Sequence, residues 1–273
     1  MLRQRTSDGW YLVRHPDHAR LAGEFAAHWG NDLFHPPEPR ADVLHGISSH
    51  DDGWAERDKR PLITRAGKPS AFGADLVGKY TAFEEIDLQD YLGVRGNALE
   101  VVAGRNPYAA ILISMHTCNL LTAHADRTTI KPVELPLLDA FVARQWERQM
   151  ELRALCAASG GYSDTDLSAE ILQQHFRLLQ ACDNLSLLSC VDFDGPATLL
   201  HALPTRSGGF QTVNVTRAGP RKFRLDPYPF DEPALSFSIP ARRVIGETFA
   251  QVTELQAQYA VAPEEAIIVE IVK

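Results

Sequence analysis

The sequence predicts an α+β fold that is mainly helical and carries a smaller β-rich C-terminal part. Segments with apolar residues at i, i+3, i+4 and i+7 recur over residues 1–193, which indicates amphipathic helices. Beyond residue 193, short runs rich in Val, Ile and Phe alternate with Gly and Pro, which is typical of strands. A chain of 273 residues can bury a sizeable core. We therefore expect a helical domain over 1–193, with an N-terminal strand, and a β-rich subdomain over 194–273 packed on it.

The same patterns predict the individual elements along the chain. Helical periodicity indicates helices at 16–30, 41–54, 81–92, 97–104, 107–125, 134–159 and 167–191. Strand-like runs lie at 9–15, 208–215, 221–230, 234–244 and 264–273. Residues 55–80 are mixed, and their Gly and Pro residues indicate loops. The N-terminal strand is expected to join the C-terminal ones.

Residues at the ends of the predicted helices support these bounds. Gly30 closes the first helix and Pro107 begins another, which agrees with the preference of each residue for that end of a helix. Asp164 or Asp166 is the expected N-cap of the last helix. Within the helix predicted at 134–159, four apolar side chains are expected near one face: Leu138, Phe141, Val142 and Trp146.

The composition excludes several classes of protein. The formal net charge is −8, and an acidic surface disfavours binding along a nucleic-acid backbone. A small anionic substrate is still compatible, because a metal or local arginines can reverse the sign inside one pocket. The cysteines show no CxxC pairing and are expected to be reduced core residues: Cys118, Cys156, Cys182 and Cys190. The polar first residues and the lack of an apolar stretch of about 20 residues predict a cytoplasmic protein with no membrane span.

Ionisable residues lie within the apolar stripes of four predicted helices. Residues at i, i+3, i+4 and i+7 share a helix face, so an ionisable residue in such a stripe points inward. His50 follows Val43 and Ile47 at this spacing, and Asp51 lies one step round the helix. The whole inward set is His18, His50, Asp51, His116 and Asp183.

The two aspartates are the strongest indication of a bound cation. A single inward histidine is more often a core residue with hydrogen-bonded ring nitrogens than a ligand. An unpaired buried carboxylate, in contrast, costs several kcal/mol or stays protonated, and neither aspartate has a basic residue on its own stripe. Imidazole and carboxylate together suit Fe, Mn, Co, Ni or Zn, whereas the lack of cysteine argues against a structural zinc site. We therefore expect one or two divalent transition-metal ions.

The order of these residues resembles the HD-domain superfamily of metal-dependent hydrolases. Its defining ligands are a histidine, an adjacent His-Asp pair and a late aspartate, and the resemblance implies an HD-like helical bundle. More narrowly, the sequence looks like an uncharacterised bacterial family of domain-of-unknown-function type across nearly the whole chain. This second resemblance rests on "PDHARLAGEFAAHWG", "HDDGW", "PYAAILISMH", "LLQACDNLSLLSC" and "PYPFDEPAL".

The HD resemblance implies roles for individual residues. The implied ligands of one metal are His18, His50, Asp51 and Asp183. His116 would bind a second ion or lie in the substrate pocket, and His124 is the nearest further candidate ligand. Many HD phosphohydrolases carry a lysine three positions after the aspartate, where this chain has Trp54. The basic residues that could replace it are Arg14, Arg57, Lys79, Arg105, Arg127 and Lys131.

The activity implied by the resemblance is hydrolysis of a small phosphate ester or nucleotide by a metal-activated water. The metal would lower the pKa of the water and polarise the oxygen under attack. Asp183, or Asp52 as a supporting carboxylate, would accept the proton of the water, and His116 would stabilise charge on the leaving side. Asp52 and Gly53 are equally compatible with simply ending the helix. Two alternatives stay open: a di-iron oxygenase of the HD type, and a non-catalytic protein that binds a metal or a small ligand.

The remaining features predict ordinary structural roles and few partners. Surface or capping roles are expected for His15, His28, His35, His45, His175 and His201. The expected partner is a small-molecule substrate, with no nucleic acid and no membrane. Unpaired edges of the C-terminal strands would allow a homodimer.

Overall fold

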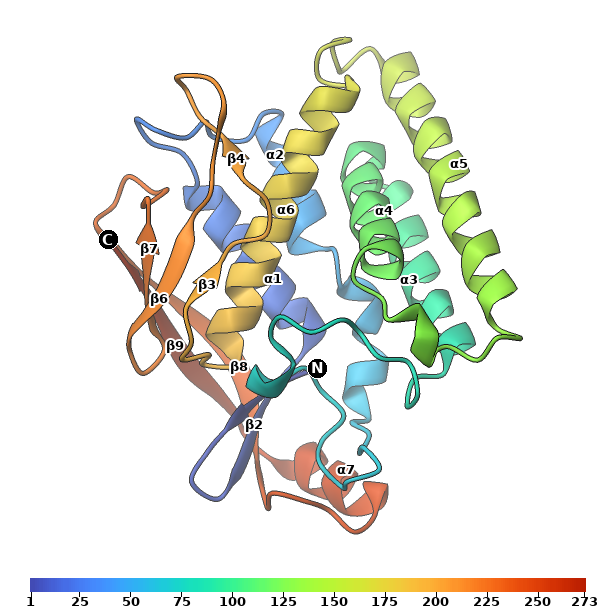
Figure 1. Cartoon of the computed structure of the whole chain (residues 1–273), viewed down its shortest axis with the longest axis vertical. Helices are drawn as coiled ribbons and strands as arrows, with labels where there is room; N and C mark the ends of the chain where they lie inside the picture. The colour runs from blue at the N-terminus through green and yellow to red at the C-terminus, as the bar shows by residue number, and fades with distance from the viewer.

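The computed structural model describes residues 1–273 and shows an α+β fold (Figure 1). The helices are α1 (His15–His28), α2 (Arg40–Ser48), α3 (Leu88–Ala103), α4 (Pro107–Thr122), α5 (Leu135–Ser159), α6 (Ala169–Cys190) and α7 (Val252–Val261). The strands are β1 (Leu2–Arg5), β2 (Gly9–Val13), β3 (Ala197–Thr198), β4 (Leu203–Pro204), β5 (Phe210–Gln211), β6 (Asn214–Gly219), β7 (Lys222–Asp226), β8 (Ala234–Ile245) and β9 (Glu264–Val272).

Seven of the strands form one sheet in the order β1-β2-β8-β9-β7-β6-β3. Neighbouring strands are antiparallel except β7 and β9, which are parallel. The N-terminal strands join the C-terminal ones through β2 and β8, with Gly9 opposite Ile245, as the sequence predicts. The strand content is therefore substantial, and the fold is more evenly mixed than the mainly helical one expected.

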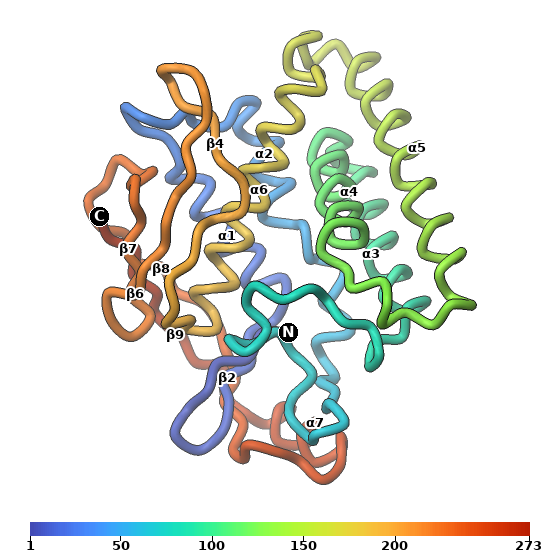
Figure 2. Tube along the Cα trace, in the orientation of Figure 1, coloured from blue at the N-terminus to red at the C-terminus, as the bar shows by residue number.

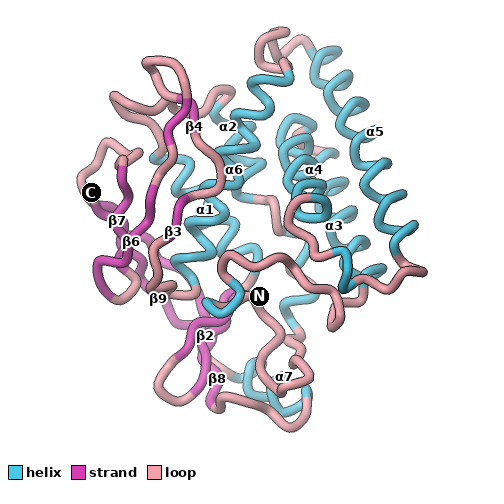
Figure 3. Tube along the Cα trace, viewed as in Figure 1, coloured by secondary structure: helices cyan, strands magenta, loops and turns pink.

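Helices α1 to α6 lie on one side of this sheet (Figure 3), whereas α7 packs against β2 and β8 in a separate apolar cluster with Trp10 and Val244. α1 and α6 pack against each other, and α1 also contacts β8, where Phe25 meets Phe237 edge to face at 4.9 Å. α2, α3, α4 and α5 stack outward from this layer (Figure 1). The chain ends at the sheet, after β9, while its N-terminus lies near the middle of the view (Figure 2). One continuous core thus draws residues from both helices and strands.

Two helices differ from the prediction in ways that matter for the site. The helix expected from Ala41 to about Trp54 ends at Ser48, and a short 3-10 helix, η1 (Asp52–Trp54), follows after a turn. The two short helices expected at 81–92 and 97–104 are one continuous helix, α3. Glycines within α3 made the sequence look interrupted, yet a glycine in a helix costs only about 1 kcal/mol and packing outweighs it.

The other helices show smaller differences. The long helices predicted at 16–30, 107–125, 134–159 and 167–191 are confirmed as α1, α4, α5 and α6. Ser168 caps α6 by accepting a hydrogen bond from the Ile171 amide, so the expected aspartate cap is wrong. Trp146 is 53 % exposed and does not lie on the buried face of α5. Helix α7 was not predicted. The four cysteines are buried and free, as expected.

None of the helices combines the length and the apolar character needed to cross a bilayer.

Candidate metal centre

The five inward residues predicted from the sequence converge in the interior of the helical layer. They come from α1, from the turn after α2, from α4 and from α6, and each is between 1 % and 6 % exposed. They form the His/Asp cluster: His18, His50, Asp51, His116 and Asp183. Within it, two groups that share His50 keep their ligand atoms within 4.8 Å of one another, one with His18 and Asp51 and one with His116 and Asp183. Such a cluster could hold a metal ion.

The early end of α2 places His50 and Asp51. Ser49 and Asp51 leave helical geometry, with φ/ψ of −113°/4° and −120°/16°. In a continuous helix the side chains of adjacent residues diverge by about 100° around the axis. Both could then bind one ion only if the ion lay between their two directions. The turn removes this conflict, because both side chains now face the interior from the same short segment.

Gly53 lets this segment lie directly against α3. A Cβ atom at Gly53 would be 2.5 Å from the carbonyl oxygen of Val94 and 2.6 Å from the Cβ of Ala98. Both distances are too short for a side chain, so only glycine permits this approach. The glycine of the HDDGW stretch therefore brings α3 to the cluster.

The potential ligand atoms have the spacing that a metal ion requires. His18 Nε2 lies 3.0 Å from Asp51 Oδ2, and His50 Nε2 lies 3.3 Å from Asp183 Oδ1. Two atoms that are each about 2.1 Å from a metal lie about 3.0 Å apart at a right angle and about 3.4 Å apart at the tetrahedral angle. The longer separation of 3.9 Å between His50 Nε2 and Asp51 Oδ2 fits a wider angle.

His50 offers a ring nitrogen that no protein group satisfies. Its Nδ1 lies 2.7 Å from the carbonyl oxygen of Ile47, which can only accept, so Nδ1 carries the proton. In a neutral ring Nε2 then has a free lone pair. This atom is fully buried and makes no hydrogen bond, although it faces both aspartates. A buried ring nitrogen that faces two carboxylates and has no hydrogen-bond partner is the feature of this site that best fits a bound cation.

Ser186 gives His18 the same tautomer. The Ser186 hydroxyl donates to the Asp183 carbonyl oxygen at 2.8 Å, so its oxygen accepts from His18 Nδ1 at 3.0 Å. His18 Nε2 is then the ring nitrogen that contacts Asp51 Oδ2, at 3.0 Å. We call the ring nitrogen that points away from the cluster, here Nδ1, the far nitrogen. A hydrogen bond to the far nitrogen orients a ligating imidazole and sets its tautomer.

His116 has a different partner on its far nitrogen. Gln180 Nε2 lies 3.0 Å from His116 Nδ1, and Gln180 Oε1 lies 3.0 Å from His201 Nε2. His116 Nε2 faces Asp183 Oδ2 at 3.9 Å. Burial lowers the pKa of His116 to about 3, so its ring is neutral.

Arg95 is the residue at this site that the sequence did not reveal. It is 7 % exposed, and its Nη1 lies 2.5 Å from Asp51 Oδ1. Burial opposes ionisation of Asp51, but Arg95 and His50 outweigh it and hold the pKa of this carboxyl well below its ordinary value. Arg95 shares an inward stripe with Tyr91 and Leu99, so the same periodicity argument identifies it once α3 is known to be continuous.

The cluster needs positive charge between its two carboxylates. Burial lowers the pKa of His50, but Asp51 and Asp183 outweigh it and raise this pKa to about 9. A proton on His50 can therefore supply this charge, and so can a metal ion on the same lone pair. The two compete for His50 Nε2.

Other predicted candidates lie outside the cluster. The Asp52 side chain is 40 % exposed and faces Arg20 at 3.8 Å. His124 follows α4 and belongs to neither ligand group. Four of the six basic residues considered as lysine substitutes form ion pairs elsewhere: Arg14 with Asp17, Arg57 with Asp90, Arg127 with Asp139 and Lys131 with Glu134.

Three histidines expected to have surface or capping roles instead make interior contacts. His15 Nδ1 lies 3.1 Å from Asp58 Oδ1, and its ring stacks on Trp54 at 4.7 Å. His175 is buried and pairs with the Tyr108 hydroxyl at 2.8 Å, and His201 pairs with Gln180. Trp54 also lies under Arg95 at 5.3 Å, so the His15 pair adjoins the cluster.

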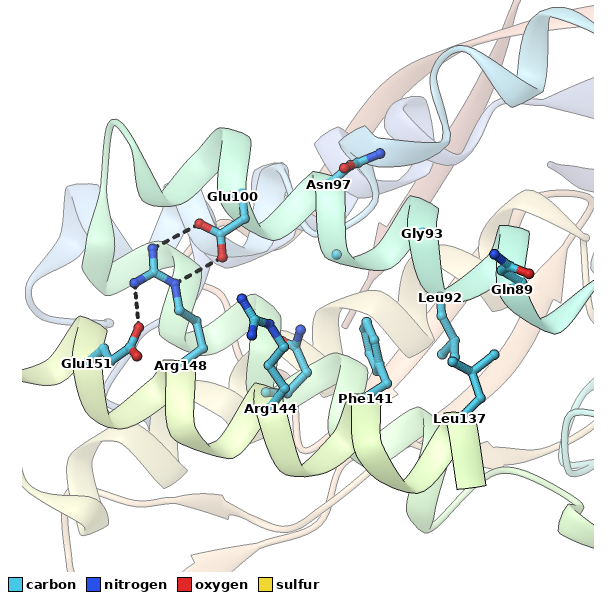
Figure 4. A pocket seen from close by; sticks show the side chains of 12 residues that line it. Gln89, Leu92, Gly93, Asn97, Glu100, Leu137, Phe141, Arg144, Arg148 and Glu151 are labelled. Atoms are coloured by element: carbon cyan, nitrogen blue, oxygen red, sulfur yellow. Dashed lines mark hydrogen bonds and ion pairs between the residues drawn. The ribbon is translucent and has the colours of Figure 1, made fainter. Parts of the chain in front are cut away.

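A hollow of about 530 Å³ lies between α3 and α5 (Figure 4). Arg148 bridges Glu100 and Glu151 at one end, and Arg144 lines the hollow beside Phe141. None of its lining residues belongs to the His/Asp cluster. It occupies a different face of α3 from Arg95 and is separate from the centre.

Comparisons with known proteins identify the family alone. Neither the curated proteins nor the solved structures gave a match to this chain. A family described as "Protein of unknown function (DUF3891)" matches residues 1–245, which include every residue of the His/Asp cluster. The chain therefore belongs to the DUF3891 family.

Proposed function

We propose that this protein is a metal-dependent hydrolase of a small phosphate ester or nucleotide, with its metal at the His/Asp cluster. The observation that carries the proposal is His50 Nε2, a buried ring nitrogen without a hydrogen-bond partner that faces Asp51 and Asp183. The order of the ligands along the chain also resembles that of the HD-domain superfamily. A histidine and carboxylate set suits Fe, Mn, Co, Ni or Zn.

The residues of the cluster have distinct parts in this proposal. His18, His50, Asp51 and Asp183 would hold the ion, which when bound would supply Lewis-acid activation of water and of the phosphoryl oxygen. Asp183 Oδ2 faces His116 and not His50, which supports a role for this oxygen in accepting the proton of the attacking water. Arg95 and Ser186 orient Asp51 and His18 through hydrogen bonds.

A non-catalytic metal-binding protein is the second candidate. Arg95, the buried cation at the centre, already pairs with Asp51 and is not free for a phosphate group. The hollow between α3 and α5 does not reach the cluster. Both observations favour a site that holds an ion and turns over no substrate.

Elemental analysis of the purified protein tests the metal site. We expect about one or two transition-metal ions per chain in the wild type and none in the His50→Ala variant. His45→Ala is the matched control, because His45 lies on the same segment and belongs to neither ligand group. Full metal content in a folded His50→Ala variant would show that the His/Asp cluster is not the metal site and would contradict the proposal.

The element and a substrate panel then separate the candidate functions. Mn, Co, Ni or Zn with hydrolysis of phosphate esters or nucleotides supports the hydrolase. Two irons with a mixed-valent spectroscopic signal would instead support an HD-type oxygenase. Stoichiometric metal with no turnover of any ester or nucleotide would leave the non-catalytic function.

A further inference from the structure

We propose that Gln180 and His201 hold His116 as a neutral imidazole with its Nε2–H turned into the centre, so that His116 donates a hydrogen bond to the substrate and is not a metal ligand. The proposal rests on the hydrolase function above. Its new element is the tautomer of His116, with Gln180 as the residue that positions its ring.

The Gln180 side chain determines the tautomer of His116. Gln180 is 1 % exposed, and its two ends contact one histidine each. The amide oxygen, at His201 Nε2, can only accept, and the amide nitrogen, at His116 Nδ1, can only donate. His116 Nδ1 therefore holds a lone pair, and the proton of the neutral ring is on Nε2.

This arrangement is opposite to that of the other two histidines. The far nitrogens of His18 and His50 face groups that accept, the Ser186 oxygen and the Ile47 carbonyl, so their Nε2 atoms are free to ligate. His116 faces a group that donates, so its Nε2 has no lone pair for a metal. The remaining set of two histidines and two aspartates is sufficient to hold one ion.

His201 holds the amide in this orientation. It lies in the loop between β3 and β4 with φ of 65°, a left-handed conformation that is uncommon outside glycine and marks a position held by its surroundings. Its ring packs against Phe176 at 5.7 Å, on the helix that carries Gln180. Burial, Arg177 and His124 lower the pKa of His201, and its Nε2 carries the proton because Gln180 Oε1 can only accept.

A neutral imidazole with an inward N–H suits stabilisation of negative charge. As water attacks phosphorus and the ester P–O bond breaks, the bonding electron pair goes to the leaving oxygen. His116 Nε2–H donates a hydrogen bond to that oxygen and keeps its proton, and the leaving oxygen is finally protonated by solvent. One preorganised donor of this kind contributes about 10²–10³ in kcat.

The tautomer can be measured without any turnover. We would record ¹⁵N spectra of protein labelled at histidine, with and without zinc, and assign His116 from its loss in a His116→Gln variant. In the wild type we expect His116 to be protonated at Nε2 and unprotonated at Nδ1. In Gln180→Glu we expect the proton of His116 on Nδ1, because the glutamate carboxylate accepts a hydrogen bond from it. Gln173→Glu, on the same helix, is the control and should leave the His116 signals unchanged.

Steady-state kinetics and metal content then test the role of His116. Both His116→Gln and Gln180→Glu should lower kcat for phosphate esters by about 10²–10³, with KM within a few-fold and metal content unchanged. A protonated Nδ1 in the wild type, or loss of metal in His116→Gln, would overturn the inference and leave the hydrolase intact. No cleavage by the wild type would overturn the hydrolase and the donor role together, while the spectra would still report the tautomer.

Discussion

Arg95 Nη1 lies 2.5 Å from Asp51 Oδ1, while Oδ2 of the same carboxylate lies 3.0 Å from His18 Nε2. Asp51 thus joins a guanidinium from α3 to an imidazole from α1 in the interior of the protein. One oxygen is neutralised by Arg95, and the other faces the position that a metal would take. The carboxylate can stay ionised and oriented before any ion binds, because Arg95 supplies the opposite charge.

Removal of Arg95 should destabilise the protein, and metal should reduce the loss. Arg95→Gln leaves Asp51 as an uncompensated buried charge, which typically costs about 3–5 kcal/mol. An ion at Asp51 Oδ2 compensates part of that charge, so the loss should be smaller in metal-loaded protein. Urea unfolding of wild type and Arg95→Gln, with and without metal, measures both quantities. An equal loss in the two states would show that no ion binds at Asp51.

Ser186→Ala should weaken metal binding by about 10–100-fold, because His18 loses the acceptor that sets its tautomer. Ser189→Ala is the matched control. Ser189 is buried in the same helix but donates to the Leu185 carbonyl, away from the cluster. Isothermal titration with zinc compares the two variants, and equal affinities would remove Ser186 from the centre.

Gly53→Ala should both destabilise the protein and weaken metal binding. The added methyl group would press on Val94 and Ala98 and push η1 away from α3, at a typical cost of about 1–3 kcal/mol. The shift would also separate Asp51 from Arg95. Gly93→Ala is the control, since a Cβ there meets nothing within 4 Å and alanine favours a helix. Unfolding free energy and zinc affinity should fall in the first variant and not in the second.

The stability of the protein should fall on acidification because of His175. Burial lowers the pKa of His175 from 6.5 to about 4, and its Nδ1 pairs with the Tyr108 hydroxyl. As the pH falls below 6.5, His175 becomes protonated in the unfolded chain but stays neutral in the folded protein. The free energy of unfolding therefore decreases until about pH 4. The slope is about 1.4 kcal/mol per pH unit for this one group.

Substitution of His175 checks this assignment. In His175→Gln the dependence of the unfolding free energy on pH between 6.5 and 4 should be flatter, by about 3 kcal/mol over the interval. His35→Gln, at an exposed position, should keep the wild-type dependence. The same slope in all three proteins would mean that His175 is protonated in the folded state.

The sequence alone determined which side chains point inward on the long helices. The periodicity of α1, α4 and α6 placed His18, His116 and Asp183 in the interior, since the apolar stripe of an amphipathic helix must be buried. It also predicted that the N-terminal strand joins the C-terminal sheet. The inward direction of the helical side chains depends on local pattern, which a single sequence contains.

The tertiary structure decided the contacts on which the chemistry depends. The packing of η1 against α3 through Gly53 brought Arg95 to Asp51, although the periodicity suggested a break in α3 at that point. The far nitrogens of His50, His18 and His116 contact Ile47, Ser186 and Gln180, respectively. These partners lie on another turn or another helix. Helical periodicity gives the direction of a side chain but not its partner, because a partner is set by the packing of segments distant in sequence.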